Sequence, residues 1–168
     1  MAAPMDGGCA VIHIINDDAA GIDFDRYCRY IESVRHDLPD AIYRFAADSR
    51  HFDLHSPQTL HDAWLDSLTI REDASGDRDE VRRLAIDICL LGPFHDRRIH
   101  LRYRGVLAYR FDVPPDAAIR FTHTGHGDLI THEVRLRHGG GVIHELLFER
   151  RGTCLIECED FSHAQEML

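Results

Sequence analysis

Residues 84–161 alternate short apolar runs with glycine turns, and this pattern constrains the fold more than any other feature of the chain. Two alternating runs flank His138-Gly139-Gly140-Gly141, and a third follows Arg151-Gly152. Glycine turns between alternating runs are typical of antiparallel hairpins. We therefore expect an antiparallel sheet whose final strands span residues 129–137, 142–149 and 153–161.

Helical periodicity is found only before this stretch. Asp23 and Pro39 are suited to begin and end a helix between them, and residues 40–48 predict a second, shorter helix, although their alternation also suits a strand. The apolar stripe of the first helix comprises Phe24, Tyr27, Cys28, Ile31, Val34 and Leu38.

Helices followed by consecutive strands predict an α+β fold, with N-terminal helices packed on a mostly antiparallel sheet of about six or seven strands. We expect one domain spanning residues 1–168, with residues 1–56 mainly helical and residues 60–161 forming the sheet. Gly105 suits a β-bulge. The shorter features that we expect are strands at 10–15, 65–71 and 119–121, an exposed turn at 72–80 and a polar tail at 162–168.

All 19 basic residues are arginines, against 29 acidic residues, which gives a formal net charge of −10. The absence of lysine excludes Schiff-base enzymes, pyridoxal-dependent enzymes and phosphate-loop enzymes. A negative surface repels phosphate backbones and anionic lipids, so we expect neither nucleic-acid nor membrane binding. A basic protein partner suits this charge better.

The five cysteines are scattered, and Cys154 and Cys158 would lie roughly 13 Å apart on one straight strand, too far for a disulfide. Free thiols indicate a reducing compartment. Residues 1–16 resemble neither a signal peptide nor a membrane span. We therefore expect a cytoplasmic protein.

Thirteen histidines predict an association that changes with pH, because each histidine can gain charge near pH 6.5. His123, His126 and Asp128 have the residue types of a zinc or iron site in a glycine loop, and a polar surface loop is the alternative interpretation. His132 and His144 alternate with apolar residues, which favours hydrogen-bonded core histidines without a common focus. We expect no cofactor.

His61-Asp62-Ala63-Trp64 joins the helical part to the sheet and contains the single tryptophan. His61, Asp62 and Trp64 are our candidate binding residues, and His61 would be a base oriented by Asp62 if the backbone turned sharply. In the structural alternative, Trp64 fills the helix–sheet seam and Asp62 caps the following turn. No G-x-S-x-G motif or phosphate-binding loop is present, so no catalytic residues are predicted.

Several short motifs lie along the sheet-forming part of the chain: His61-Asp62-Ala63-Trp64-Leu65, Leu90-Leu91-Gly92, Phe94-His95-Asp96, Tyr103-Arg104-Gly105-Val106 and Tyr109. With these motifs the chain resembles a family of small uncharacterised bacterial proteins, and the likeness spans about residues 45–161. This resemblance implies no established activity and carries no catalytic residues. More loosely, a His-Asp pair followed by antiparallel strands looks like the immunity proteins of bacterial toxin systems.

The sequence therefore predicts a non-enzymatic module that binds another protein, of which a basic toxin is one example. A metal-dependent hydrolase that uses His123, His126 and Asp128 is the alternative. A homo-oligomeric structural protein, such as a homodimer, is a third.

Overall fold

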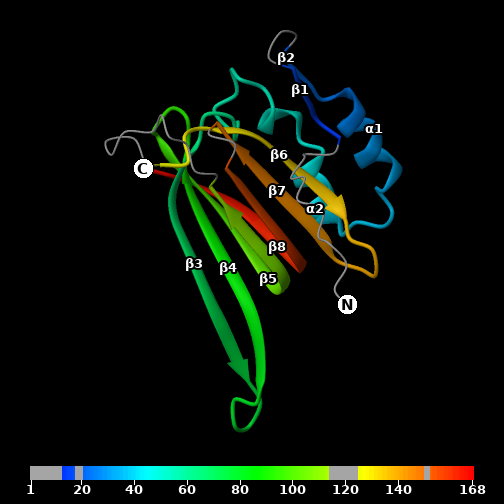
Figure 1. The fold of residues 1–168 in the computed structure, drawn as a ribbon, viewed down its shortest axis with the longest axis vertical. Coiled ribbons are helices and arrows are strands. Elements are labelled where there is room, and N and C mark those ends of the chain that lie inside the picture. The colour runs from blue at the N-terminus through cyan, green and yellow to red at the C-terminus, as the bar shows by residue number, and fades with distance from the viewer. Residues whose placement is uncertain (1–12, 18–20, 114–124, 150–151) are drawn as a thin grey trace.

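The computed structural model describes residues 13–17, 21–113, 125–149 and 152–168 (Figure 1). A small antiparallel hairpin precedes two helices and a 3-10 turn, and a six-stranded antiparallel sheet follows, in the order β3-β4-β5-β8-β7-β6. This confirms the α+β class and the antiparallel sheet. The elements are β1 (Ile15–Asp17), β2 (Gly21–Asp23), α1 (Asp25–Ser33), α2 (Asp40–Ala46), η1 (Ser49–His51), β3 (Trp64–Ser75), β4 (Val81–Leu91), β5 (Arg97–Asp112), β6 (Leu129–Leu136), β7 (Val142–Phe148) and β8 (Thr153–Met167).

Both predicted helices form. The Asp23 carboxylate accepts a hydrogen bond from the backbone N–H of Asp25 at 2.9 Å, which satisfies a free donor at the start of α1. Tyr27 and Ile31 are buried as expected. Cys28 is exposed, so its place in the buried stripe was wrong. The helix is one turn shorter than its apolar pattern suggested.

The glycine turn between β6 and β7 lies where the sequence places it. β6 pairs with β7 and β7 pairs with β8, both antiparallel, and Gly139, Gly140 and Gly141 all have positive φ. The bulge is confirmed as well, because Gly105 has φ +58° and the register shifts just beyond it. However, β5 pairs with β8 rather than with β6, so the sheet is not simply a series of consecutive hairpins.

Two strands are longer than their apolar patterns. β8 continues to Met167 along β5, so the prediction of a polar tail at 162–168 is wrong. β3 continues to Ser75, so the first part of the turn expected at 72–80 is strand instead. In both cases a long neighbouring strand supplies the backbone partners, and side-chain polarity does not prevent ladder pairing. The strand expected at 119–121 and most of the one expected at 10–15 lie outside the described residues.

The sheet curls until its two edges meet at one end. The N–H of Asp62 donates to the carbonyl of Leu129, and the N–H of Leu129 donates to the carbonyl of Ala63, both at 2.9 Å. The hairpin of β3 and β4 extends from the other end, away from the helices (Figure 1). Curling gives the sheet an enclosed inner face, where α1 and α2 contribute Tyr27, Ile42 and Phe45 to one buried cluster with strand residues.

Candidate functional site

The His61-Asp62-Trp64 motif lies where the curled sheet closes. Asp62 has φ +62°, a sharp turn that brings its Oδ1 within 2.8 Å of His61 Nδ1, although the two atoms are not aligned for a hydrogen bond. The backbone therefore provides the turn that an oriented base would require. Trp64 is 48% exposed and its ring contacts His95, so the prediction that it fills the helix–sheet seam is wrong.

The loop proposed to hold a metal is described only in part, because His123 lies outside the described residues. His126 packs against Phe148, and its Nδ1 is buried without a hydrogen-bond partner. Burial lowers the pKa of His126. Within the described ranges, no group of three or more histidine, cysteine, aspartate or glutamate side chains is arranged to hold a metal ion.

Four other imidazoles gather around one phenylalanine in the interior. The ring of Phe45 lies 4.6 Å from His51, 5.2 Å from His132, 5.6 Å from His144 and 4.9 Å from His163, between ring centroids. The expectation that the histidines have no common focus is therefore wrong. The sequence separates these residues by up to 112 positions, and only the pairing of β7 with β6 and β8, together with α2 above them, brings the rings together.

His132 and His144 are hydrogen-bonded core histidines, as predicted. The Tyr103 hydroxyl lies 2.8 Å from His144 Nδ1, and His144 Nε2 lies 3.2 Å from His132 Nδ1. This series of hydrogen bonds ends at His132 Nε2, which is buried without a partner. Burial lowers the pKa of His144 to about 3 and holds the pKa of His132 well below its ordinary value.

Burial therefore keeps His132, His144 and His163 neutral in mild acid, so these three do not contribute to the charge change that the sequence suggested. Desolvation is the largest cause of the lowered pKa in each of them. The histidines with a lowered pKa are His13, His51, His126, His132, His144 and His163. Whether association changes with pH stays a prediction.

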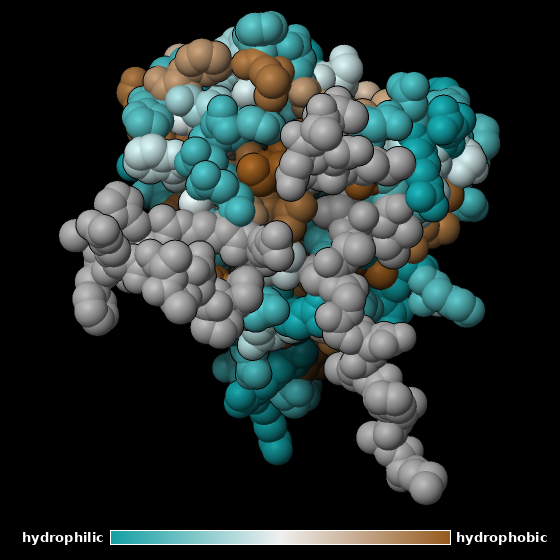
Figure 2. All heavy atoms as spheres, turned by 45° about the horizontal axis from the view of Figure 1, so that its top comes forward, coloured by the Kyte–Doolittle hydropathy of each residue, from teal (hydrophilic) through white to brown (hydrophobic). Residues whose placement is uncertain are grey.

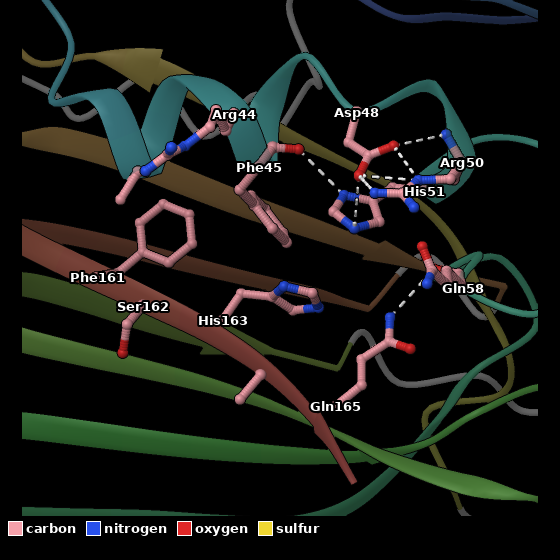
Figure 3. A pocket seen from close by; sticks show the side chains of 12 residues that line it. Arg44, Phe45, Asp48, Arg50, His51, Gln58, Phe161, Ser162, His163 and Gln165 are labelled. Carbon is pink, nitrogen blue, oxygen red and sulfur yellow. Dashed lines mark hydrogen bonds and ion pairs between the residues drawn. The ribbon is translucent and has the colours of Figure 1, made fainter. Parts of the chain in front are cut away.

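A cavity of about 460 Å³ opens beside this histidine cluster, between α2 and η1 on one side and β8 on the other (Figure 3). His51 and His163 line it together with Phe45 and Phe161. Sequence reasoning missed this site. One signal was present in the sequence. Phe161, His163 and Gln165 are spaced two residues apart, so their side chains would lie on the same face of a strand.

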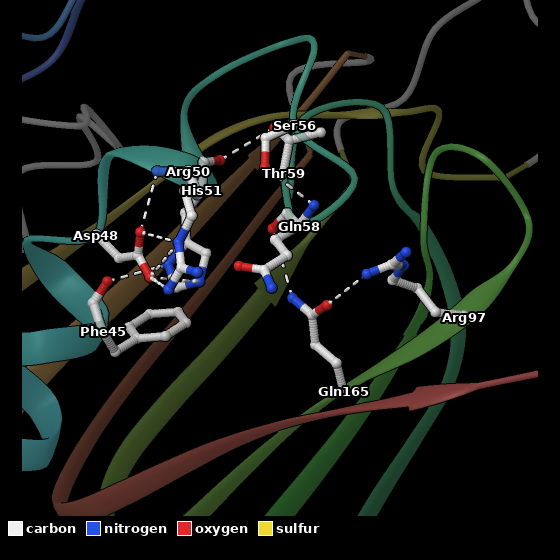
Figure 4. Close-up of polar contacts among 9 residues, drawn as sticks. All are labelled: Phe45, Asp48, Arg50, His51, Ser56, Gln58, Thr59, Arg97 and Gln165. Atoms are coloured by element: carbon white, nitrogen blue, oxygen red, sulfur yellow. Dashed lines mark hydrogen bonds and ion pairs between the residues drawn. The ribbon is translucent and has the colours of Figure 1, made fainter.

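Hydrogen bonds hold both the ring and the backbone carbonyl of His51 (Figure 4). Its Nδ1 lies 3.0 Å from the carbonyl of Phe45, and its own carbonyl accepts hydrogen bonds from the Thr59 hydroxyl and the Leu60 N–H, each at 3.1 Å. A carbonyl can only accept, so Nδ1 must carry the proton. In neutral His51, Nε2 is therefore an acceptor.

Asp48 and Arg50 form a rigid pair at the mouth of the cavity. The Arg50 guanidinium donates to both carboxylate oxygens of Asp48, at 2.8 and 2.6 Å, and this pairing lowers the Asp48 pKa to about 2. Asp48 Oδ2 also lies 4.0 Å from His51 Nε2, beyond hydrogen-bond distance. The two charges of this pair largely cancel, so a net charge at the cavity must come from other side chains.

A buried charge cluster joins β6 to β7. Arg135 Nη1 donates to Glu133 at 2.7 Å and to Glu145 at 2.8 Å, and both carboxylates are fully buried. Glu133 also accepts from the backbone N–H groups of His13 and Ile14. Burial of two carboxylates requires such partners, so this cluster has a structural role.

The two edges of the sheet differ. On β6, the N–H of Val134 donates to the Tyr27 hydroxyl at 3.0 Å and the N–H of Leu136 donates to the Tyr30 hydroxyl at 2.8 Å. Along β3, by contrast, the backbone hydrogen bonds within the described part of the chain go only to β4. Helix α1 therefore covers one edge, and no described residue other than those of β4 pairs with the backbone of the other.

No family model, curated protein or solved structure matches the chain. No helix within the described ranges is long and apolar enough to cross a membrane.

Proposed function

We propose that the protein is a non-enzymatic binding module that docks a basic, extended segment of another protein along β3. The observation that supports this proposal is the open edge of β3, opposite an edge that tyrosine hydroxyls close. An open edge strand presents backbone N–H and C=O groups with which a partner strand can pair. Such a partner would also give β3, a 12-residue strand, a neighbour on the side where the described ranges supply none.

Apolar side chains along β3 would add specificity to such a contact. Leu68 and Ile70 are 36% and 40% exposed, and they stand in register with Ile88 and Ile86 of β4, which are buried. The apolar inner face of the sheet therefore extends to the edge strand β3, where its side chains are partly exposed to solvent. One face of the molecule is shown in Figure 2, where hydrophilic side chains predominate and apolar ones gather in smaller areas. A partner strand beside β3 would bury the row of Leu68 and Ile70.

The charge near the end of β3 favours a basic partner. Residues 72–80 contain five carboxylates and one arginine. Arg82 pairs with Glu72 and Arg71 with Asp73, whereas Asp77 and Asp79 make no ion pair within the described ranges. Opposite charge speeds encounter and fixes the register of a docked segment. A basic toxin of a bacterial toxin system is one such partner.

The test uses two labelled peptides in fluorescence anisotropy, one alternating arginine with valine and one alternating glutamate with valine. We expect the basic peptide to bind and the acidic one not to. The double variant Leu68→Arg/Ile70→Arg should weaken binding at least roughly tenfold, because it places positive charge on the docking row. Leu107→Arg is the matched control, since Leu107 is 52% exposed on β5.

Equal weakening by the control, or no binding of the basic peptide, would argue against the proposal. A stable dimer that the double variant dissociates would assign β3 to a second copy of the chain instead. Pull-down from native cytosol at low salt then identifies the natural partner. Recovery of no β3-dependent partner would count against the proposal.

A metal-dependent hydrolase remains the second candidate, because His126 Nδ1 is buried without a partner near Asp128 in the sequence. Elemental analysis of protein purified without chelators tests this candidate. Stoichiometric zinc or iron that His126→Gln removes would support it, and metal-free protein would exclude it.

A further inference from the structure

We propose that the cavity between α2, η1 and β8 binds a small hydroxylated aromatic acid. This site is separate from β3, and the proposal goes beyond protein docking. Its volume, about 460 Å³, lies in the range of small-molecule sites in proteins. Three properties of its lining lead to this ligand class: aromatic walls, one uncompensated positive charge and a fixed hydrogen-bond acceptor.

Aromatic rings form the walls. Phe45 and Phe161 meet edge to face at 5.1 Å between centroids, and His163 lies 4.9 Å from Phe45 and 5.0 Å from His51. Figure 3 shows these side chains projecting from α2, η1 and β8 toward the same space. Offset and edge-to-face contacts with such rings favour a planar aromatic ligand over an aliphatic one of equal size.

The charge of the lining favours an anion. Arg50 is neutralised by Asp48, whereas Arg44, on the exposed side of α2, makes no ion pair or hydrogen bond within the described ranges. A guanidinium is well suited to a carboxylate, which it can bind through two parallel hydrogen bonds. Arg44 thus gives this cavity a local positive charge on a chain whose formal net charge is −10.

The imidazoles supply acceptors for a hydroxyl group. Because His51 Nδ1 donates to the carbonyl of Phe45, its Nε2 has a free lone pair in the neutral state. His163 also lines the cavity and its Nε2 has no hydrogen-bond partner; a ligand hydroxyl would satisfy this atom in either tautomer, because a hydroxyl both donates and accepts. Gln165 is already engaged, with Arg97 and with the carbonyl of Gln58 (Figure 4).

Four probes separate these contributions: 4-hydroxybenzoate, benzoate, 4-hydroxybenzyl alcohol and inorganic phosphate. Binding is followed by NMR through the ring signals of His51 and His163, which are assigned from His163→Phe and His51→Gln. We expect 4-hydroxybenzoate to bind most tightly. Benzoate, which lacks the hydroxyl, and 4-hydroxybenzyl alcohol, which lacks the carboxylate, should each bind roughly five- to tenfold more weakly. Phosphate should bind weakest.

Arg44→Gln should weaken 4-hydroxybenzoate roughly tenfold and leave 4-hydroxybenzyl alcohol unchanged. The matched control is Arg29→Gln, since Arg29 is an exposed arginine of α1 that does not line the cavity. Equal effects of the two variants, phosphate binding as tight as the aromatic acid, or no shift of either histidine at millimolar probe would each overturn the proposal. The Leu68→Arg/Ile70→Arg variant should still bind 4-hydroxybenzoate. Loss of peptide docking along β3 can therefore be distinguished from loss of ligand binding in the cavity.

Discussion

The Tyr103 hydroxyl lies 2.8 Å from His144 Nδ1, and this contact joins two fully buried polar side chains that are 41 residues apart in the sequence. Tyr103 lies on β5 and His144 on β7, with β8 between them. The two residues satisfy each other where water is excluded, so the stability of the inner face should depend on both.

Tyr103→Phe should lower the free energy of unfolding by about 1–3 kcal/mol, because it removes the hydroxyl and leaves a buried nitrogen of His144 without its partner. Urea unfolding followed by circular dichroism measures the change. Tyr109→Phe is the matched control, since Tyr109 is 44% exposed on the same strand, and it should change stability little. Equal losses for the two variants would show that the Tyr103–His144 contact is not a source of stability.

The free energy of unfolding should fall as the pH decreases from 7 toward 5. Burial holds the pKa of His144 at about 3 and that of His163 at about 4, while an unfolded histidine titrates near 6.5. Between these values the unfolded chain binds more protons than the folded chain. The contribution is therefore complete above about pH 6.5 and is lost below it, at up to about 1.4 kcal/mol per pH unit for each histidine.

Urea midpoints across this pH range test the linkage. His163→Phe should reduce the slope of stability against pH by about one proton equivalent, because it removes one of the buried bases. A profile that is flat between pH 7 and 5 would contradict the burial of these imidazoles in their neutral form.

Arg135→Met should destabilise the fold by about 3–5 kcal/mol, because Glu133 and Glu145 lose the guanidinium that they share in the interior. Thermal and urea unfolding measure the loss. Arg110→Met replaces an exposed arginine of β5 and should be nearly neutral. If Arg135→Met is as stable as Arg110→Met, the buried cluster does not require its positive member.

Gly141→Ala should be more damaging than Gly140→Ala, although both glycines have positive φ, +83° and +101°. A Cβ at Gly141 would meet the backbone carbonyl oxygen of Cys158, whereas a Cβ at Gly140 would meet nothing within 4 Å. Strain at positive φ costs about 1–2 kcal/mol at either position, and only Gly141→Ala adds a backbone clash between the turn and β8. Comparison of the two unfolding midpoints isolates that clash.

The sequence predicted those elements whose local pattern decides their structure. Alternation from Leu129 to Leu136 and from Val142 to Phe148, with three glycines between, is sufficient for a hairpin. Residues 162–167 are mostly polar and show no apolar alternation, and this part of β8 forms because β5 supplies its backbone hydrogen-bond partners. The pairing of β5 with β8 joins strands that are distant in the sequence, and no local run of residues encodes it.

The sequence by itself determined the class of the protein: two amphipathic helices, antiparallel strands, glycine turns and an acidic surface. These follow from interactions between neighbouring residues and from composition. Only the tertiary structure decided which histidines share a cavity, which edge of the sheet is closed and which of the arginines at the cavity is unpaired. Each of these depends on side chains that are distant in the chain but adjacent in space, and strand order, which long-range pairing sets, determines that adjacency.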